Sequence, residues 1–245
     1  MDLSEEVMAQ VRAELAPTGV LRAGINLSNF LLVTGKTDEG NPEGVSPSMA
    51  AEVARRLSVD IQYVTFKTPG ELADAATDNV WDIGLIGAEP ERARHITFTK
   101  AYSEIEATYL VPAGSSLNSI EDVDQPGIRI SVPARAAFEL WLTDNIQHAE
   151  LHRAVGRQAY DDFVEQGFDA LAGLRAGLIN DVDNLPGSRI LDGKFTSVQQ
   201  AIGTPKGRDV AAKFLSDFVE EAKRTGFVGE LIEHFGVNGR LTPAP

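Results

Sequence analysis

Short apolar segments alternate with segments of helical periodicity along most of the chain. The apolar segments predict strands at residues 20–25, 61–66, 81–88, 128–132, 150–155, 168–174 and 198–204. Between them, apolar residues recur every three or four positions, which predicts helices from Ser46, from Thr68 to about Asp78, and over 136–143 and 158–166. Strands that alternate with helices in this way indicate right-handed βαβ units, and therefore an α/β fold with a doubly wound sheet.

Prolines and glycines mark several helix ends. Ser46 precedes Pro47 and Thr68 precedes Pro69, which predicts two helices that carry proline at their first position. A short amphipathic helix near the N-terminus is predicted to end at Pro17 and Gly19; its apolar stripe consists of Leu3, Val7, Met8, Val11 and Leu15. Apolar residues at helical spacing predict two more helices near the C-terminus, at residues 211–222 and 228–235.

The length of the chain fits two lobes. Its 245 residues are enough for two cores of about 100 residues each. No Gly/Ser-rich linker occurs, so the lobes are expected to be joined by ordered strands, for which residues 102–111 and 198–204 are the candidates.

Composition excludes several classes of function. The net charge is -14, so nucleic acids and anionic membrane surfaces are poor partners. The chain has no cysteine, which excludes disulfides, thiol nucleophiles, zinc–thiolate sites and iron–sulfur clusters. No apolar run reaches the roughly 18 residues of a membrane span. The sequence also lacks a basic start followed by an apolar stretch, the pattern of a secretory signal.

Several motifs, in order along the chain, resemble the bacterial extracellular solute-binding proteins of family 3, the amino-acid type that serves ABC importers. They include Trp81-Asp82-Ile83, Pro90-Glu91-Arg92-Ala93, Phe98-Thr99-Lys100-Ala101-Tyr102, Gly167-Phe168-Asp169-Ala170, and the tail from Arg224 to Gly236. The resemblance begins at residue 18 and implies the type 2 periplasmic-binding-protein fold, with two hinge strands and a cleft between the lobes. On this basis we expect an N-terminal helix at 1–17, lobe 1 at 18–106 and 201–245, and lobe 2 at 107–200.

The resemblance also locates candidate ligand contacts and shows where this chain departs from the family. Arg92 is retained, whereas Glu89, after Ala88, stands where relatives that bind α-amino acids present threonine. In lobe 2, Arg135 and Ala136 replace the usual Gly-Thr or Gly-Ser at a helix start, and Arg175 follows the position of the usual acceptor for an ammonium group. The family's ammonium acceptor is therefore missing.

These positions predict a cluster of Arg92, Arg135 and Arg175 at strand ends, suited to forked recognition of a carboxylate. The expected ligand is an amino acid, a modified amino acid or a small organic acid, captured by hinge closure. The alternative for either lobe 2 arginine is a solvated surface charge. Glu89 has the alternative role of capping a helix that begins at Pro90.

The loop after the first strand supplies further candidates. Phe30 stands where relatives place a ligand-stacking aromatic, and Asn26 and Asn29 are candidate hydrogen-bonding residues. Packing into the core is the alternative for Phe30. Tyr102 is expected to pack at the hinge.

Signals for catalysis or metal binding are weaker. His148 and His152 have the i, i+4 spacing of some zinc sites, but His152 falls in a predicted strand, so no metal and no cofactor are expected. A dehydratase-like enzyme on this fold would need a carboxyl acid, for which Glu89 is the first candidate and Glu104 and Glu106 are second. A ligand sensor without a transporter is the third alternative.

The expected partners are a small ligand and an ABC permease, and a monomer is the default. The resemblance implies a periplasmic location, whereas a complete chain without a signal would be cytoplasmic.

Overall fold

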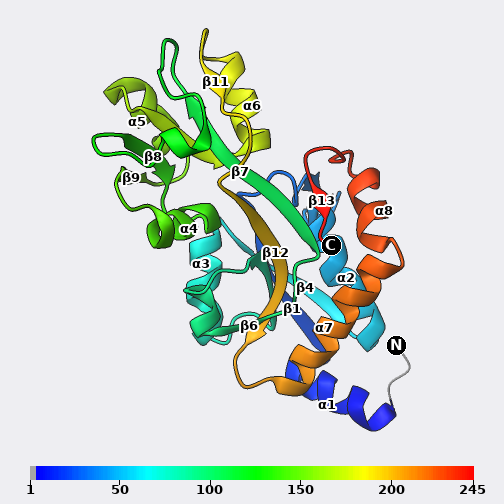
Figure 1. Cartoon of the computed structure of the whole chain (residues 1–245). Helices are drawn as coiled ribbons and strands as arrows, with labels where there is room; N and C mark the ends of the chain where they lie inside the picture. Colours follow the sequence, from blue (N-terminus) through cyan, green and yellow to red (C-terminus); the bar gives the residue numbers. More distant parts are fainter. Residues whose placement is uncertain (1–3) are drawn as a thin grey trace. The chain divides into compact units, whose positions relative to one another are not determined.

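The computed structural model describes residues 4–245 and divides the chain into two compact units. Unit 1 comprises the residues up to Glu104 together with Gln199–Pro245, and unit 2 comprises Ile105–Val198. The chain passes from one unit to the other within strands β7 (Ser103–Val111) and β12 (Thr196–Pro205). Both connections therefore run through regular strands, without a loop (Figure 1).

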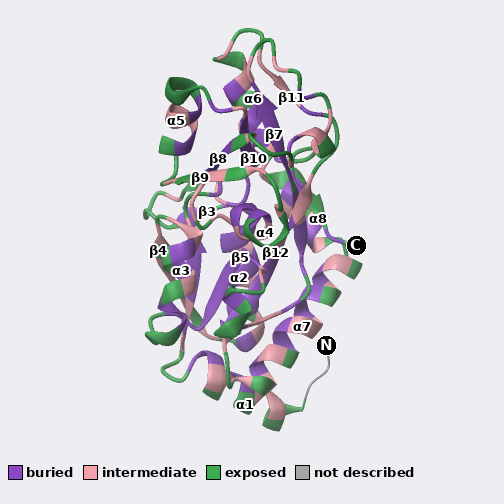
Figure 2. Ribbon diagram, turned by 60° about the vertical axis from the view of Figure 1, so that its left-hand side comes forward, coloured by how far each residue is buried: buried purple, intermediate pink, exposed green. Residues whose placement is uncertain are grey.

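Unit 1 is built on a sheet of mainly parallel strands. Its strands run in the order β4 (Asp60–Phe66), β1 (Val20–Asn26), β5 (Ile83–Gly87) and β12. β1 is parallel to both β4 and β5, while β12 is antiparallel to β5. All five residues of β5 are buried, as expected for an apolar strand covered on both faces (Figure 2). The smaller strands are β2 (Gly35–Lys36), β3 (Pro42–Glu43), β6 (Ile96–Phe98) and β13 (Thr242–Pro243).

The helices of unit 1 bury one apolar face each. They are α1 (Glu5–Leu15), α2 (Val45–Leu57), α3 (Pro69–Asp74), α7 (Asp209–Arg224) and α8 (Phe227–His234), with the short 3₁₀ helices η1 (Ala75–Thr77) and η2 (Arg92–Arg94). The buried face of α7 repeats every three or four residues and consists of Ala211, Phe214, Leu215, Phe218, Val219 and Ala222. The predicted helices at both ends of the chain are confirmed; Leu3 lies outside the described residues.

Two helix starts illustrate how local sequence sets the boundaries. Thr68 caps α3 by accepting the Glu71 N–H, as predicted from Thr68-Pro69. The prediction for Ser46-Pro47 is wrong by two residues, because Gly44 is the N-cap of α2 and Pro47 lies at the third helical position. Gly44 has a φ of 148°, and a Cβ there would lie 2.3 Å from the carbonyl oxygen of Leu32. Glycine is thus the residue that permits this start.

A buried carboxylate joins three segments of unit 1. Asp82, which is 0% exposed, accepts hydrogen bonds from the Arg22 backbone N–H (3.0 Å), Nε (2.9 Å) and Nη2 (2.8 Å). It also accepts one from Arg208 Nη1 at 3.0 Å. The carboxylate before β5 is therefore bonded to β1 and to the residue that precedes α7.

Trp81, immediately before Asp82, has the largest side chain of a core cluster that includes Leu72 and Ile86. Its Nε1–H donates to the Leu72 carbonyl at 3.0 Å. Gly24 and Gly84 leave room for the indole, since a Cβ on either would lie 3.3 Å from the ring. The tryptophan thereby packs directly on β1 and β5.

The start of α7 is capped from another helix. Arg208, its N-cap residue, makes no side-chain cap bond, but Glu14 of α1 accepts the Ala211 N–H at 2.8 Å. α1 packs along α7 and buries Val11 and Leu15 (Figure 1). The Glu14 carboxylate thus satisfies a helix donor that would otherwise need water.

Unit 2 repeats the α/β pattern. Its sheet runs in the order β7, β10 (Ala170–Leu174), β8 (Arg129–Pro133) and β9 (Glu150–Ala154), with β11 (Arg189–Ile190) on β7. β8 is parallel to β9 and β10, and β7 is antiparallel to β10. The helices are α4 (Ala137–Asn145), α5 (Gln158–Gln166) and α6 (Arg175–Asp183), with the 3₁₀ helix η3 (Ile120–Asp122).

Helix α6 was not predicted. Its sequence, RAGLINDVD, contains glycine in the first turn and three polar residues in its last four, so its apolar periodicity is weak. Ala176 and Leu178 are nevertheless buried on it. Tertiary packing, rather than local pattern, forms this helix. Within residues 4–245, no helix is both long enough and apolar enough to cross a bilayer.

Candidate ligand-binding site

The candidate residues of unit 1 lie at one edge of its sheet. Because β1 and β5 are parallel neighbours, the residues that follow them meet at the same edge. We call Asn26–Phe30, which begins at the last residue of β1, and Ala88–Arg92, after β5, the carboxyl edge of unit 1. Open α/β sheets bind ligands at such edges.

The loop after β1 is held by its own asparagines. Asn26 Oδ1 accepts the backbone N–H and the hydroxyl of Ser28, at 3.1 and 2.7 Å. Asn29 is buried, and its Oδ1 accepts the Leu31 N–H at 3.1 Å. Phe30, in contrast, is 42% exposed, so the alternative that it packs into the core is wrong. The turn chemistry of the asparagines fixes the loop that presents the phenyl ring.

Arg92 is fixed at the end of β5. The residue is 6% exposed, and its Nη1 donates to the Gly87 carbonyl at 2.7 Å. The helix expected at Pro90 is wrong: a turn is followed by the three-residue η2, with the Ala93 N–H bonded to the Glu89 carbonyl at 2.9 Å. The Glu89 carbonyl accepts the first hydrogen bond of this helical turn, and a capping role for its side chain stays a prediction. The buried guanidinium is held rigidly, which favours directional recognition.

The candidate residues of unit 2 lie at the corresponding edge of its own sheet. Arg135 and Ala136 follow β8, and Arg175 follows the parallel neighbour β10. Because β7 runs antiparallel to β10, with Ala107 opposite Leu174, Glu106 lies at the same edge. We call Arg135, Ala136, Arg175 and Glu106 the carboxyl edge of unit 2. The two lobe 2 arginines of the sequence prediction thus follow neighbouring parallel strands, and their role as ligand contacts stays a prediction.

Arg135 has a backbone conformation that favours glycine. Its φ is +62°, in the left-handed region that disfavours side chains with a Cβ. The turn directs its backbone N–H to Glu139 Oε2 at 2.9 Å. A non-glycine residue in this conformation stores strain, which is typical of functional sites.

Glu139 is a buried residue of this edge that the sequence analysis missed. Its side chain is 4% exposed, and the carboxylate also accepts from Thr143 Oγ1 and Arg153 Nε, each at 2.7 Å. The position of an acid in the first turn of α4 resembles half of a capping box, a signal that could have identified it. An anion already occupies the start of α4, so a ligand carboxylate there would meet a like charge.

Replacing Arg135 with glycine should raise stability while it removes a candidate ligand contact. We expect the free energy of unfolding to rise by about 0.5–1 kcal/mol in Arg135→Gly, because glycine adopts this φ without strain. Arg135→Ala keeps the strained Cβ and serves as the control. Urea unfolding of both variants tests this; a glycine variant less stable than the alanine variant would contradict it.

Arg175 already has partners within unit 2. Its Nε donates to Glu106 Oε2 at 2.9 Å, and its Nη2 donates to the Gly193 carbonyl, which also accepts from Thr108 Oγ1 at 3.0 Å. Lys194 Nζ lies 3.8 Å from Glu106 Oε1. Arg175 is 30% exposed and Glu106 49% exposed in their side chains, so both can still reach a ligand.

Tyr102 and His152, two further residues considered in the sequence, both have side-chain partners in the structure. Tyr102 is buried, and its hydroxyl is 2.8 Å from Ser46 Oγ; burial raises the pKa of the phenol well above its usual value. His152 lies in β9 and is 2.6 Å from Asp162, where the hydrogen bond with the imidazole lowers the pKa of that carboxyl group. In the described part of the chain, no three histidine, aspartate or glutamate side chains are grouped to hold a metal ion.

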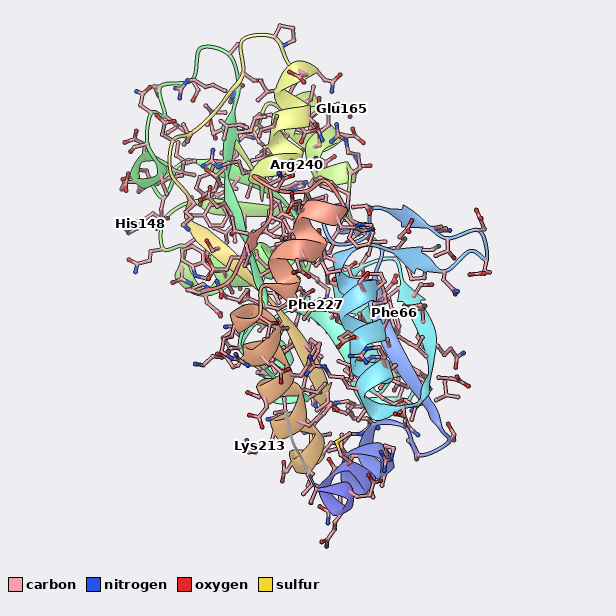
Figure 3. The ribbon with its side chains drawn as sticks, turned by 90° about the vertical axis from the view of Figure 1, so that its right-hand side faces the viewer. Phe66, His148, Glu165, Lys213, Phe227 and Arg240 are labelled. Atoms are coloured by element: carbon pink, nitrogen blue, oxygen red, sulfur yellow. The ribbon has the colours of Figure 1, made fainter. Side chains whose placement is uncertain are left out.

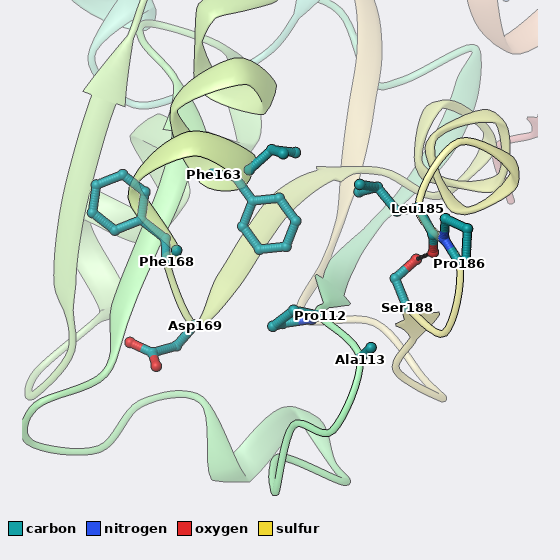
Figure 4. A pocket seen from close by; sticks show the side chains of 10 residues that line it. Pro112, Ala113, Phe163, Phe168, Asp169, Leu185, Pro186 and Ser188 are labelled. Atoms are coloured by element: carbon teal, nitrogen blue, oxygen red, sulfur yellow. Dashed lines mark hydrogen bonds between the residues drawn. The ribbon is translucent and has the colours of Figure 1, made fainter.

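An apolar pocket of about 280 Å³ lies at the opposite edge of the unit 2 sheet, where β10 begins and β7 ends (Figure 4). Phe163, Phe168 and Leu185 supply much of its wall, and Asp169 lies at its margin. Asp169 Oδ2 accepts the Arg129 backbone N–H at 2.8 Å, so this carboxylate serves the sheet. The pocket contains none of the predicted ligand contacts.

Solved structures share this fold. The ancestral amino acid-binding protein AncCDT-1, a precursor of cyclohexadienyl dehydratase, has a TM-score of 0.71 at 19% identity, over 91% of this chain and 97% of that chain. A putative ABC-transporter binding component from Wolinella succinogenes, complexed with lysine, has a TM-score of 0.73 at 20% identity, over 91% and 97%. A mutant of ArgBP from T. maritima has a TM-score of 0.69 at 21% identity, over 94% and 99%. The predicted α/β fold of the two-lobed periplasmic binding proteins is confirmed.

At the level of sequence, comparison with curated proteins gave no match. The model of the family described as bacterial extracellular solute-binding proteins, family 3, matches residues 23–238. The match covers most of both units and contains all the candidate contacts. The chain therefore belongs to family 3 of the bacterial extracellular solute-binding proteins.

Proposed function

We propose that this protein captures a small polar organic ligand with a carboxylate group, an amino acid or a related organic acid, by hinge closure of its two units. One observation carries the proposal: each unit presents arginine at the carboxyl edge of its parallel strands, Arg92 in unit 1 and Arg135 and Arg175 in unit 2. Contacts that only the closed state makes would bias the equilibrium between open and closed forms.

The free energy of hydrogen bonds from arginine is large enough to favour a ligand with an anionic group. A charge-assisted hydrogen bond contributes roughly 1.5–3 kcal/mol, so two such bonds would give several decades of preference for an anion. Arg92 is already fixed by the Gly87 carbonyl, which reduces the entropy lost when it binds.

We further propose that the protein delivers its ligand to the permease of an ABC importer. The relatives support this: one solved structure with a TM-score of 0.69 is the substrate-binding protein of an amino acid ABC transporter. Capture without turnover is the proposed activity. Incubation with each ligand followed by NMR should return it unchanged; consumption of the ligand would favour the dehydratase alternative.

A thermal-shift screen of amino acids and organic acids tests the binding proposal. A ligand at ~100 times its dissociation constant adds about 2.7 kcal/mol. That should raise the unfolding midpoint by roughly 5–10 °C. Arg92→Ala should abolish the shift, because the carboxylate loses its fixed partner in unit 1.

Arg94→Ala is the matched control, since Arg94 lies on the same 3₁₀ helix but is exposed. Each shift is measured against the variant's own midpoint without ligand. An undiminished shift in Arg92→Ala would refute the role of Arg92. A full panel without any shift in the wild type would refute the proposed ligand class.

A further inference from the structure

Strand β13, near the C-terminus, pairs with one of the two strands that join the units. It runs antiparallel to β7, with Thr242 opposite Glu104. The Ala244 N–H donates to the Tyr102 carbonyl at 3.1 Å, and Thr242 Oγ1 donates to the Glu104 carbonyl at 3.4 Å. The residues of β7 that pair with β13 are therefore the two that belong to unit 1, before the chain passes into unit 2.

Tyr102, the residue before β7, is bonded to other segments of unit 1 through its backbone and its side chain. Its N–H donates to the Gln200 carbonyl of β12 at 2.8 Å, and its carbonyl accepts from Ala244. Its hydroxyl is 2.8 Å from Ser46 Oγ in α2. The start of β7 is thus fixed to unit 1 at several points, and β13 supplies one of the two backbone contacts of Tyr102.

The segment that contains β13 is itself anchored at both ends. Leu241 and Ala244 are buried, and β13 packs on α8 (Figure 1). Lys223, near the end of α7, donates from Nζ to the Pro245 carbonyl at 2.9 Å, and its side chain is only 10% exposed. A segment anchored to two helices of unit 1 can resist displacement of the strand with which it pairs.

Beyond Glu104, β7 pairs with strands of unit 2. Its residues 107–110 pair with β10, and its residues 110–111 pair with β11. Ile105 and Glu106 lie between the residues that pair with β13 and those that pair with β10. The partners of β7 on this part of the strand therefore change at these two residues.

We infer that β13 is a strap that clamps the unit 1 end of β7 and confines the bending of this strand to Ile105 and Glu106. The inference rests on the hinge closure of the proposed function, in which a few residues absorb the change in backbone angles. Without the strap, residues 102–104 would share in the bending. The ligand-free protein would then sample a wider range of arrangements of its two units.

Ala244→Pro tests whether β13 holds the strand, because proline lacks the N–H that donates to the Tyr102 carbonyl. Amide hydrogen exchange, followed by mass spectrometry, should become at least about fivefold faster at residues 103–105. Ala244→Gly keeps the N–H and is the matched control, with exchange within about twofold of the wild type. Unchanged exchange in Ala244→Pro overturns the inference.

A second measurement tests whether this hold limits the motion of the units. The chain has no cysteine, so Lys213→Cys and Glu165→Cys provide one spin label on α7 of unit 1 and one on α5 of unit 2, both at exposed positions (Figure 3). Electron–electron double resonance then gives the distribution of distances between the labels. In the ligand-free protein, Ala244→Pro should widen this distribution by at least about 1.5-fold.

Trp81→Phe is the control for a general loss of stability, because it loosens the core of unit 1 beside β1 and β5. It should leave the width of the distribution within about 1.2-fold of the wild type. Faster exchange in Ala244→Pro without a wider distribution overturns the inference, as does an equal widening in Trp81→Phe. Neither measurement needs a ligand, so an Arg92-dependent thermal shift would still leave the proposed function standing.

Discussion

Replacing Asp82 with alanine should lower the free energy of unfolding by about 3 kcal/mol. The change removes the acceptor for the Arg22 and Arg208 side chains and for one backbone N–H of β1. A buried charge pair broken on one side typically costs 3–5 kcal/mol, and we take the lower end because both arginines reach solvent. The unfolding midpoint should fall by roughly 6–12 °C.

Two further variants make this test specific. Asp78→Ala, in the exposed turn before β5, removes the same charge and should change stability by less than about 0.5 kcal/mol. Asp82→Asn keeps the shape of the side chain, so its free energy of unfolding should lie between those of Asp82→Ala and Asp78→Ala. Equal midpoints for Asp82→Ala and Asp78→Ala would show that the buried carboxylate does not hold β1 and α7 to β5.

Replacing Trp81 with alanine should cost about 3–5 kcal/mol, the usual range for a large aromatic in a packed core. The indole is fully buried against Leu72 and fills the space above Gly24 and Gly84. Its removal leaves a cavity directly beneath β1 and β5, and it leaves the Leu72 carbonyl without its indole donor. Urea unfolding followed by circular dichroism avoids the loss of the fluorescent residue itself.

The chain has only two tryptophans, which supplies the control. Trp141 is partly buried and contacts Phe195, with ring centroids 5.6 Å apart. Trp141→Ala should therefore cost less than Trp81→Ala, and Trp81→Phe, which keeps most of the volume, should cost about 1–2 kcal/mol. A Trp81→Ala variant as stable as Trp81→Phe would mean that the surrounding side chains collapse into the space.

The alternation of apolar segments with helical periodicity was enough to predict the α/β fold. The strand at 20–25 and the helices that cover 158–166 and 211–222 are confirmed because each has a strong local pattern. Helix α6 was missed because its periodicity is weak and only contacts with the rest of unit 2 stabilise it. The start of α2 depends on the close approach of Gly44 to Leu32, which no local pattern encodes.

The sequence predicts less of the candidate site than of the fold. Family positions indicated Arg92, Arg135 and Arg175, whose role as ligand contacts stays a prediction. The sequence does not show that Glu106 lies beside Arg175, because the two are 69 positions apart and meet only through the pairing of β7 with β10. Nor does it show that Arg22, in the predicted first strand, is the partner of Asp82.

The cap that Glu14 provides for α7 matters to anyone who would turn this protein into a fluorescent sensor. A reporter domain spliced into or in place of α1 would remove the acceptor of the Ala211 N–H and uncover Val11 and Leu15. The attachment point should therefore precede Ser4, so that the whole of α1 remains in the hybrid protein.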